Sequence, residues 1–405
     1  MKDHIVKISI DQLIAGMYVH DLSSEWTDTP FNRRFMVTDI GMANRIREYG
    51  IRELYIDTFK GKAPQGEVAT RLEVEEELDE QINQMLKEST RTHQVSYTEE
   101  IGAARQIHQM ATGKVVSILS DARLGKRIEA EKMEPVVASM TSSILRNPSA
   151  MMSLGRIRDA DQYTFEHSVS VATFLIAFAR AQGMDESTTH HIGMGAMLHD
   201  IGKTQVPESI LNKPGKLTDE EFAIMKSHAP LGAELLANCR GISAIAIDVA
   251  AQHHERYDGT GYPRGLKGDN ISHYGQMAAV VDVYDAITSD RCYHKGQSPT
   301  AVLRKLLEWS KFHFNPLVVQ QFIKCVGIYP PGSLVRLSND HLAIVLDTDA
   351  ANTLQPTVRV IYNIVSRRPV RPYTLKLQQE ESSSHKITGF EDQDKWNIPI
   401  EPFLK

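Results

Sequence analysis

Apolar and polar positions follow two different periods along this chain. Residues 5–56 contain short stretches in which apolar and polar residues alternate, and one amphipathic stretch at 42–50 that ends on Gly50. Alternation is typical of strands and a glycine commonly ends a helix, so we expect a small α+β module here. Residues 58–96 are rich in charged and turn-forming residues, which predicts a solvated, partly helical connector.

From Tyr97 to Val326, apolar residues recur three or four positions apart, which predicts a series of helices. One of them is expected to run from Asp219 to Ala237. Beyond Pro330 the pattern alternates again and predicts a small antiparallel sheet, followed by a loosely ordered polar end. The fold class is therefore mainly α: a helical bundle with a small N-terminal α+β module and a short C-terminal antiparallel β-segment. The expected divisions are an N-terminal module (1–58), a charged linker (59–96), a helical domain (97–330), a small β-segment (331–375) and a polar tail (376–405).

Composition and charge narrow the class of protein. The 405 residues are 41% hydrophobic and 24% charged, as in ordinary globular proteins, and the formal net charge of -6 favours neither a DNA or RNA partner nor a membrane surface. No stretch is long and apolar enough to span a membrane, and the first residues lack the apolar core of a secretory signal. The three cysteines lie far apart, which argues against a disulfide framework and a cysteine zinc site. We therefore expect a cytoplasmic protein.

Histidines are concentrated in one part of the helical region, where nine of the sixteen lie between residues 163 and 294. Taken singly, each polar residue there has an ordinary explanation. A histidine such as His167 on an apolar helix face is more often packed in a core than bound to a metal, and His228 resembles a surface residue near a turn. Asp200 could simply pair with Lys203. Taken together, histidines and aspartates on successive helices that otherwise bury apolar faces favour a metal site.

The residue types and their spacing indicate a pair of transition metals. Imidazole and carboxylate suit iron, manganese, zinc or nickel rather than calcium. Asp200 ends an apolar helix and Asp282 interrupts an apolar helical face, so each is a costly buried charge that a metal compensates. His253 and His254 point about 100° apart on a helix and so reach different positions around a metal pair. A shared Asp200 would let two ions activate water for attack on a phosphodiester, with Lys203 neutralising the phosphate.

Three motifs carry a resemblance to a known family. The stretches HDIGK (199–203), HHERYDGTGYP (253–263) and DVYDAITSDRCY (282–293) closely resemble the HD-GYP family, a branch of the HD-domain metal-dependent phosphohydrolases. The resemblance covers roughly residues 100–330 and follows the family's order and spacing. It implies an α-helical HD fold with a two- or three-metal centre that usually contains iron. It also implies hydrolysis of cyclic di-GMP to linear pGpG, and in some members on to GMP.

The resemblance assigns roles position by position. It implies one ion held by His167, His199, Asp200 and Asp282, and a second held by Asp200, His228, His253 and His254. Asp200 and Lys203 would be catalytic, with Lys203 on the scissile phosphate, and Arg291 would help to hold the substrate. Gly261, Tyr262 and Pro263 form the GYP loop, which is expected to shape the pocket rather than to supply a ligand.

The chain departs from the family pattern in two places. Members with three metals carry a glutamate one helical turn before the first histidine, where this chain has Tyr163, so we expect two divalent metals and a reaction that stops mainly at pGpG. Cys292 and His294 replace the proline and arginine more common in the family, which puts the substrate contacts of that loop in doubt. Residues 13–57 resemble a small domain that often precedes HD-GYP domains, and its TDTPF segment (27–31) either contacts the catalytic domain or only packs within the module.

Alternative functions stay open. A phosphodiesterase specific for 3′,3′-cyclic GMP-AMP fits the same residues, as does a non-catalytic cyclic-dinucleotide sensor or interaction protein. A nucleotide phosphohydrolase of the wider HD superfamily is less consistent with the HHE and GYP motifs. GYP loops also contact partner signalling domains, so a protein partner is compatible with catalysis, and a homodimer is left open.

Overall fold

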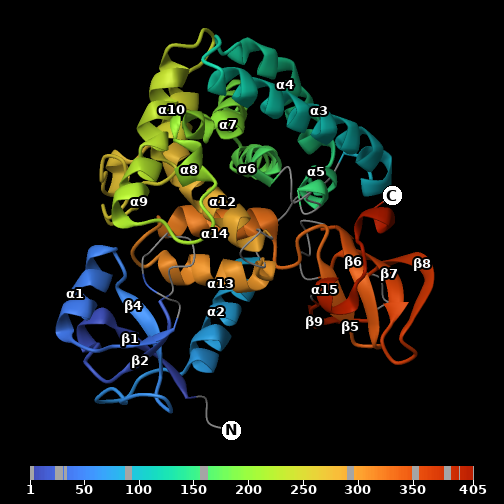
Figure 1. The fold of residues 1–405 in the computed structure, drawn as a ribbon. Helices are drawn as coiled ribbons and strands as arrows, with labels where there is room; N and C mark the ends of the chain where they lie inside the picture. Colours follow the sequence, from blue (N-terminus) through green and yellow to red (C-terminus); the bar gives the residue numbers. More distant parts are fainter. Residues whose placement is uncertain are drawn as a thin grey trace.

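The computed structural model describes residues 4–22, 31, 34–86, 94–155, 163–289, 296–348, 355–377, 385–391 and 393–404. Within these residues a helical bundle lies between two small sheet-containing parts (Figure 1). The N-terminal part is blue, the bundle runs from cyan to orange, and the C-terminal sheet is red. The predicted mainly α fold with flanking β-containing parts is confirmed. No described helix is both long and apolar enough to cross a membrane.

The N-terminal module is a four-stranded sheet covered by one helix. Its elements are β1 (Ile5–Ser9), β2 (Tyr18–Asp21), β3 (Phe35–Met36), α1 (Ile40–Glu48) and β4 (Glu53–Asp57), with antiparallel strand pairs in the order β1-β4-β2-β3. The Asp39 side chain accepts from the Met42 amide and so caps α1. Val19, Ile46 and Leu54 are buried in a core separate from that of the bundle. Gly50 follows α1 with a φ of 80°, a conformation that glycine adopts readily.

The predicted solvated connector contains a helix that packs into the bundle. Helix α2 (Arg71–Leu86) buries Leu78, Ile82 and Leu86. These side chains are four residues apart and form one apolar face, which joins the main core beside α13 and α14. Arg304 of α13 forms an ion pair with Asp79 of α2. The expectation of a solvated connector was therefore wrong for these residues, because the short apolar stripe finds a partner.

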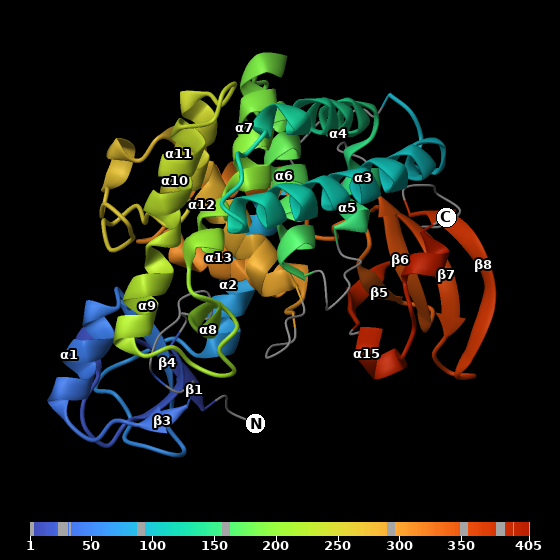
Figure 2. The same cartoon turned by 45° about the horizontal axis from the view of Figure 1, so that its top comes forward.

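The bundle consists of twelve described helices, and all of them except α8 and α9 contribute side chains to one large core. They are α3 (Tyr97–Arg123), α4 (Glu134–Arg146), α5 (Pro148–Leu154), α6 (Tyr163–Ala181), α7 (Glu186–Leu198), α8 (Glu208–Leu211), α9 (Asp219–Lys226), α10 (His228–Ala237), α11 (Ala244–Gln252), α12 (His273–Thr288), α13 (Pro299–Trp309) and α14 (Pro316–Val326). A 3-10 turn, η4 (Ile201–Gln205), follows α7. The helix predicted at 219–237 is divided at Ser227 into α9 and α10. This break starts α10 on His228, and α9 lies between α10 and the N-terminal module (Figure 2).

The C-terminal part is a five-stranded antiparallel sheet. Its strands are β5 (Leu334–Leu337), β6 (His341–Asp347), β7 (Thr357–Asn363), β8 (Arg368–Lys376) and β9 (Ile387–Phe390), in the order β8-β7-β6-β5-β9. Strand β9 and helix α15 (Gln393–Trp396) come from the stretch expected to be a loose polar tail. Ile400 and Leu404 beyond them are buried in the main core. A few well-spaced apolar residues thus hold this end of the chain in place, although its average composition is polar.

Candidate metal centre

The seven side chains expected to be metal ligands lie on or next to five helices and meet at one place in the bundle. All are buried except His254, which is partly buried. They are His167 on α6, His199 and Asp200 directly after α7, His228 at the start of α10, His253 and His254 directly after α11, and Asp282 on α12. Helices α6, α7, α11 and α12 pack on one another, and this packing brings their polar residues together.

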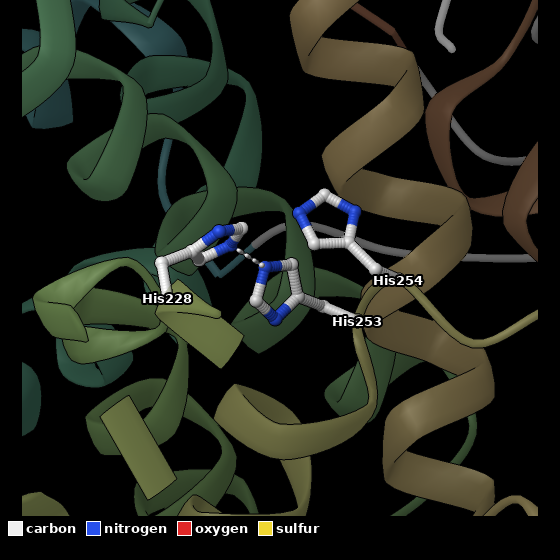
Figure 3. Close-up of side chains that lie close together, drawn as sticks. All are labelled: His228, His253 and His254. Carbon is white, nitrogen blue, oxygen red and sulfur yellow. Dashed lines mark hydrogen bonds between the residues drawn. The ribbon is translucent and has the colours of Figure 1, made fainter. Parts of the chain in front are cut away.

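These side chains form two clusters that are joined by one carboxylate. His167, His199 and Asp282 offer ligand atoms that all lie within 4.8 Å of one another, and so do His228, His253 and His254. Figure 3 shows the second cluster, in which Nε2 of His228 and Nε2 of His253 are 3.4 Å apart. Such convergence of imidazoles from separate helices is the arrangement that a divalent transition metal requires.

Asp200 lies between the clusters and faces each with a different oxygen. Its Oδ2 is 3.4 Å from Nε2 of His199 and 4.0 Å from Nε2 of His167. Its Oδ1 is 3.6 Å from Nε2 of His228 and 3.9 Å from Nε2 of His253. One carboxylate can therefore reach both positions, as a bridging ligand of a two-metal site does.

Three of the histidines are oriented by the helix that precedes them. The Nδ1 atoms of His199, His228 and His253 lie 2.8, 2.7 and 2.8 Å from the carbonyl oxygens three residues earlier, at positions 196, 225 and 250. A carbonyl can only accept, so Nδ1 carries the proton in each ring. The lone pair is then on Nε2, which faces the cluster and is free to bind a cation.

His167 is oriented by a side chain instead. Its Nδ1 is 2.6 Å from Oδ2 of Asp285, and Oδ1 of Asp285 accepts a hydrogen bond of 2.6 Å from the hydroxyl of Ser170. Asp285 is only 1% exposed. The sequence reasoning assigned it no role, although it lies three residues after Asp282 and thus on the same helical face.

The electrostatics fit neutral imidazoles and ionised carboxylates. Burial lowers the pKa of His228 to about 4, and burial together with the nearby His199 lowers the pKa of His253 to about 3. Burial alone would also lower the pKa of His199, but the charge of Asp200 outweighs it and raises that pKa to about 8. Burial opposes ionisation of Asp200, yet Lys203 and His199 hold its pKa well below the usual range. These are the protonation states that metal ligands need, apart from the proton that a metal would displace from His199.

Among the residues that the structure describes, two buried atoms at the centre find no hydrogen-bond partner, namely Nε2 of His199 and Oδ1 of Asp200. Buried polar atoms in this state are costly unless something else satisfies them. Both atoms point into the space that the ligand set surrounds. The donor set and these two atoms therefore fit a bound divalent cation.

Two residues of the HDIGK motif complete the local geometry. Nζ of Lys203 is 2.6 Å from Oδ2 of Asp200, and the lysine side chain is 30% exposed, so it lies at the edge of the cluster. A Cβ on Gly202 would lie 1.9 Å from the carbonyl oxygen of His228 and 2.5 Å from the amide nitrogen of Gly232. Only glycine lets η4 approach α10 this closely, and the approach brings Asp200 next to His228.

The GYP loop folds over the His253–His254 pair. The buried carboxylate of Glu255 accepts hydrogen bonds of 2.8 and 2.9 Å from the amides of Arg264 and Leu266, which closes the loop on itself. A Cβ on Gly261 would lie 2.3 Å from the amide nitrogen of residue 256. The Tyr262 ring stacks on His254 at 4.6 Å between centroids.

The residues expected to bind substrate fall into three groups: those at the candidate centre, those beside them in the loop, and those outside the described residues. Lys203 and Tyr262 lie at the candidate centre, and Gly261 and the half-buried Pro263 flank Tyr262 in the loop. Arg291, together with Cys292 and His294, lies outside the described residues. Glu255, like Asp285, was missed as a supporting residue. Its place in the HHE motif was the available signal.

Comparison with known proteins gives two family matches. Residues 151–318 match the HD domain family, and residues 5–133 match a domain of unknown function (DUF3391). The chain is 39% identical to a cyclic di-GMP phosphodiesterase of Pseudomonas aeruginosa over 394 residues, which cover 97% of this chain and 93% of that protein.

Two relatives from Vibrio cholerae match over a smaller share of the chain. One is a cyclic di-GMP phosphodiesterase, 41% identical over 40% of this chain and 34% of its own length. The other is a 3′,3′-cGAMP-specific phosphodiesterase, 37% identical over 40% of this chain and 31% of its own length. The identity to these two relatives is therefore close to equal, and this chain spans only about a third of the length of each.

Proposed function

Because this chain belongs to the HD-GYP branch of the HD domain family, we propose that it is a metal-dependent phosphodiesterase of cyclic dinucleotides. The observation that carries the proposal is the convergence of two ligand clusters on Asp200. The Pseudomonas aeruginosa relative, which aligns over nearly the whole chain and is named for this activity, supports it.

The proposed centre holds two divalent transition-metal ions, with iron the first candidate and manganese, nickel and zinc the others. His167, His199, Asp200 and Asp282 would hold one ion, and Asp200, His228, His253 and His254 the other. Each set contains imidazole and carboxylate donors, which suit these metals. When bound, such a pair supplies a nucleophile from water near neutral pH and stabilises charge on a phosphoryl oxygen.

The chain itself contributes binding and orientation. Lys203 has a charged, partly exposed end beside Asp200, so it is suited to neutralise a phosphate brought to the clusters. The Tyr262 ring stacks on His254, which supports a role for the GYP loop as a wall of the proposed substrate site. We keep Arg291 as a proposed substrate contact on the strength of the motif alone.

The substrate is proposed to be cyclic di-GMP, opened to pGpG. Hydrolysis of 3′,3′-cyclic GMP-AMP is the second candidate, because the two Vibrio cholerae relatives, one named for each activity, are 41% and 37% identical over 40% of this chain. We propose a cytoplasmic site of action, because three widely spaced cysteines fit a reducing compartment. The domain boundaries expected from the sequence, a signalling partner at the GYP loop and a homodimer also remain proposals.

The test combines metal analysis with turnover of both substrates by the purified full chain. We expect about two transition-metal ions per chain and linearisation of at least one cyclic dinucleotide. Metal-loaded protein that is inert on both substrates but binds one of them would refute the enzyme and favour the non-catalytic sensor.

A matched pair of variants tests the bridging role. Asp200→Ala should lose metal and activity together, because its two oxygens face both clusters. Asp248→Ala is the control: within the described part of the chain, this partly buried carboxylate on α11 accepts a hydrogen bond from Gln252 alone and lies outside the clusters. Retained activity in Asp200→Ala would contradict the proposed bridge.

A further inference from the structure

The N-terminal module contacts the rim of the candidate centre. We define this rim as α9 and the whole GYP loop, residues 255–266, which contains Gly261, Tyr262 and Pro263. The turn after α1 makes this contact through Tyr49 and Gly50. Both ribbon views show α1 beside α9 (Figures 1 and 2). The module matches a domain of unknown function, so a physical role for this contact is of interest.

Tyr49 reaches α9 with its side chain. Its hydroxyl donates a hydrogen bond to Oδ1 of Asp219, the first residue of α9. Burial and this carboxylate raise the pKa of Tyr49 to about 12, so the hydroxyl stays a donor at neutral pH. Helix α9 ends at Lys226, two residues before His228. Holding the start of α9 therefore constrains the short segment that delivers one proposed ligand.

Tyr49 reaches the GYP loop with its backbone. Its carbonyl accepts a hydrogen bond of 3.2 Å from Nη1 of Arg256, a residue that is 9% exposed. The same nitrogen donates to the hydroxyl of Thr260 at 3.4 Å. A Cβ on Gly50 would lie 2.7 Å from that nitrogen and 2.8 Å from the Thr260 hydroxyl. The turn thus fits closely against the loop, and a larger residue than glycine would push it away.

The two rim elements also meet each other at Tyr262. The ring of Phe222 on α9 lies 6.4 Å from the Tyr262 ring, and Nζ of Lys226 lies 6.0 Å from it. Tyr262 in turn stacks on His254. The distance between α9 and the GYP loop therefore determines how much space is left beside His228 and His254.

We propose that Tyr49 is a positioning residue through which the N-terminal module braces the rim and keeps α9 and the GYP loop at the spacing that substrate binding requires. One residue makes both contacts, hydroxyl to α9 and carbonyl to the loop, so displacement of the module would release both elements together. Lys216, just before α9, also donates to the carbonyl of Phe31, at the end of the TDTPF segment whose other residues lie outside the described part. This inference rests on the proposed function for the expected change in KM. The expected change in the hydrogen exchange of α9 and the GYP loop does not depend on it.

The same module offers a matched control on another face. The hydroxyl of Tyr55 donates a hydrogen bond of 3.0 Å to Glu308 of α13, and Lys7 forms an ion pair of 2.6 Å with the same carboxylate. Tyr55→Phe removes an interdomain hydrogen bond to a carboxylate, just as Tyr49→Phe does, but α13 carries no proposed ligand. If the module only packs on the bundle, the two variants should behave alike.

The experiment compares Tyr49→Phe and Tyr55→Phe in the full-length protein by hydrogen exchange and steady-state kinetics. For Tyr49→Phe we expect about fivefold to tenfold faster exchange in residues 219–226 and 255–266, and a KM raised by a similar factor, because one hydrogen bond to a charged group is lost. Metal content and kcat should stay within about twofold, because no proposed ligand is changed. Tyr55→Phe should leave the exchange rates of these residues, the KM, the metal content and kcat near those of the parent protein. Equal effects of the two variants, or no faster exchange in Tyr49→Phe, would overturn the brace.

A second pair of variants isolates the Tyr49 hydroxyl contact. Asp219→Asn keeps an oxygen acceptor for the hydroxyl and should retain slow exchange, whereas Asp219→Ala should match Tyr49→Phe. The double variant Tyr49→Phe/Asp219→Ala should be no worse than either single variant. Additive losses in the double variant would contradict the brace. Hydrogen exchange needs no turnover, so a protein that is inert on cyclic dinucleotides would still reveal whether Tyr49 holds α9 and the GYP loop. The proposed enzyme activity and the proposed role of Tyr49 can therefore be refuted separately.

Discussion

Replacing Asp285 by asparagine tests whether the orientation of His167 controls metal binding. Asparagine keeps the size of the side chain but has one acceptor oxygen where the carboxylate has two. The carboxylate serves Nδ1 of His167 and the hydroxyl of Ser170 at 2.6 Å each, so asparagine can satisfy only one of them. If its amide faces the ring, His167 moves its proton to Nε2, the atom 3.0 Å from Asp282 that would bind the metal.

The expected magnitude follows from the kind of contact that is lost. Outer partners of metal-bound histidines typically contribute a factor of about 10–100 in metal affinity, or roughly 1.4–2.7 kcal/mol. His167 belongs to only one of the two proposed ligand sets. The loss should therefore affect one ion per chain, and the set containing His228, His253 and His254 should keep its metal.

Competitive titration against a chromophoric chelator measures the affinity for each ion, and elemental analysis of the purified protein gives the number of ions per chain. Glu100→Gln is the control, because Glu100 is a carboxylate of 3% exposure that bonds Ser143 and Arg146 far from the clusters. The control should lower the melting temperature without changing metal affinity. Unchanged affinity of both ions in Asp285→Asn, or an equal loss in the control, would refute the reasoning.

Two further predictions concern the loop and the metal. Gly261→Ala should lower turnover by at least about tenfold while metal content is retained, because the new Cβ would lie 2.3 Å from the backbone of residue 256 and displace the loop; unchanged kinetics would contradict the close packing. Chelation should lower the melting temperature by about 3–6 °C, since each of two ions at a hundred times its Kd stabilises the protein by about 2.7 kcal/mol, and the unfolding entropy of a 405-residue chain is about 0.85 kcal/mol/K. Scanning calorimetry with and without chelator measures this shift, and identical curves would argue against occupied clusters.

The fold class was predictable because helical and strand periods differ so clearly along this chain. What escaped prediction depended on partners distant in sequence. Helix α2 has only a narrow apolar stripe, and its burial depends on α13 and α14, more than two hundred residues later. The break at Ser227 lies within a continuous helical pattern, so periodicity alone could not locate it. Strand β9 pairs with β5 through backbone hydrogen bonds, which leave little trace in composition.

For the candidate site, the sequence identified side chains better than their supports. Histidines and aspartates on apolar helix faces are conspicuous, and the structure brings all seven together, although metal binding by them stays a prediction. The supporting carboxylates Asp285 and Glu255 were not recognised, because acidic residues are common and their partners are unremarkable in sequence. The bond from Asp285 to His167 spans 118 residues, so only the folded chain reveals it. The role proposed for Tyr49 could not be predicted from the sequence either, because it depends on contacts with α9 and the GYP loop.

The source of each histidine's orientation limits how this centre can change in evolution. The acceptors for His199, His228 and His253 are backbone carbonyls, which every amino acid supplies, so no side-chain replacement at those positions deletes them. The acceptor for His167 is the carboxylate of Asp285, which one nucleotide change in its codon can neutralise. Adjustment of affinity or metal preference by point mutation is thus open mainly on the His167 side. Point mutations in related proteins could therefore change the metal affinity of the position that includes His167, while the position formed by His228, His253 and His254 stays almost unchanged.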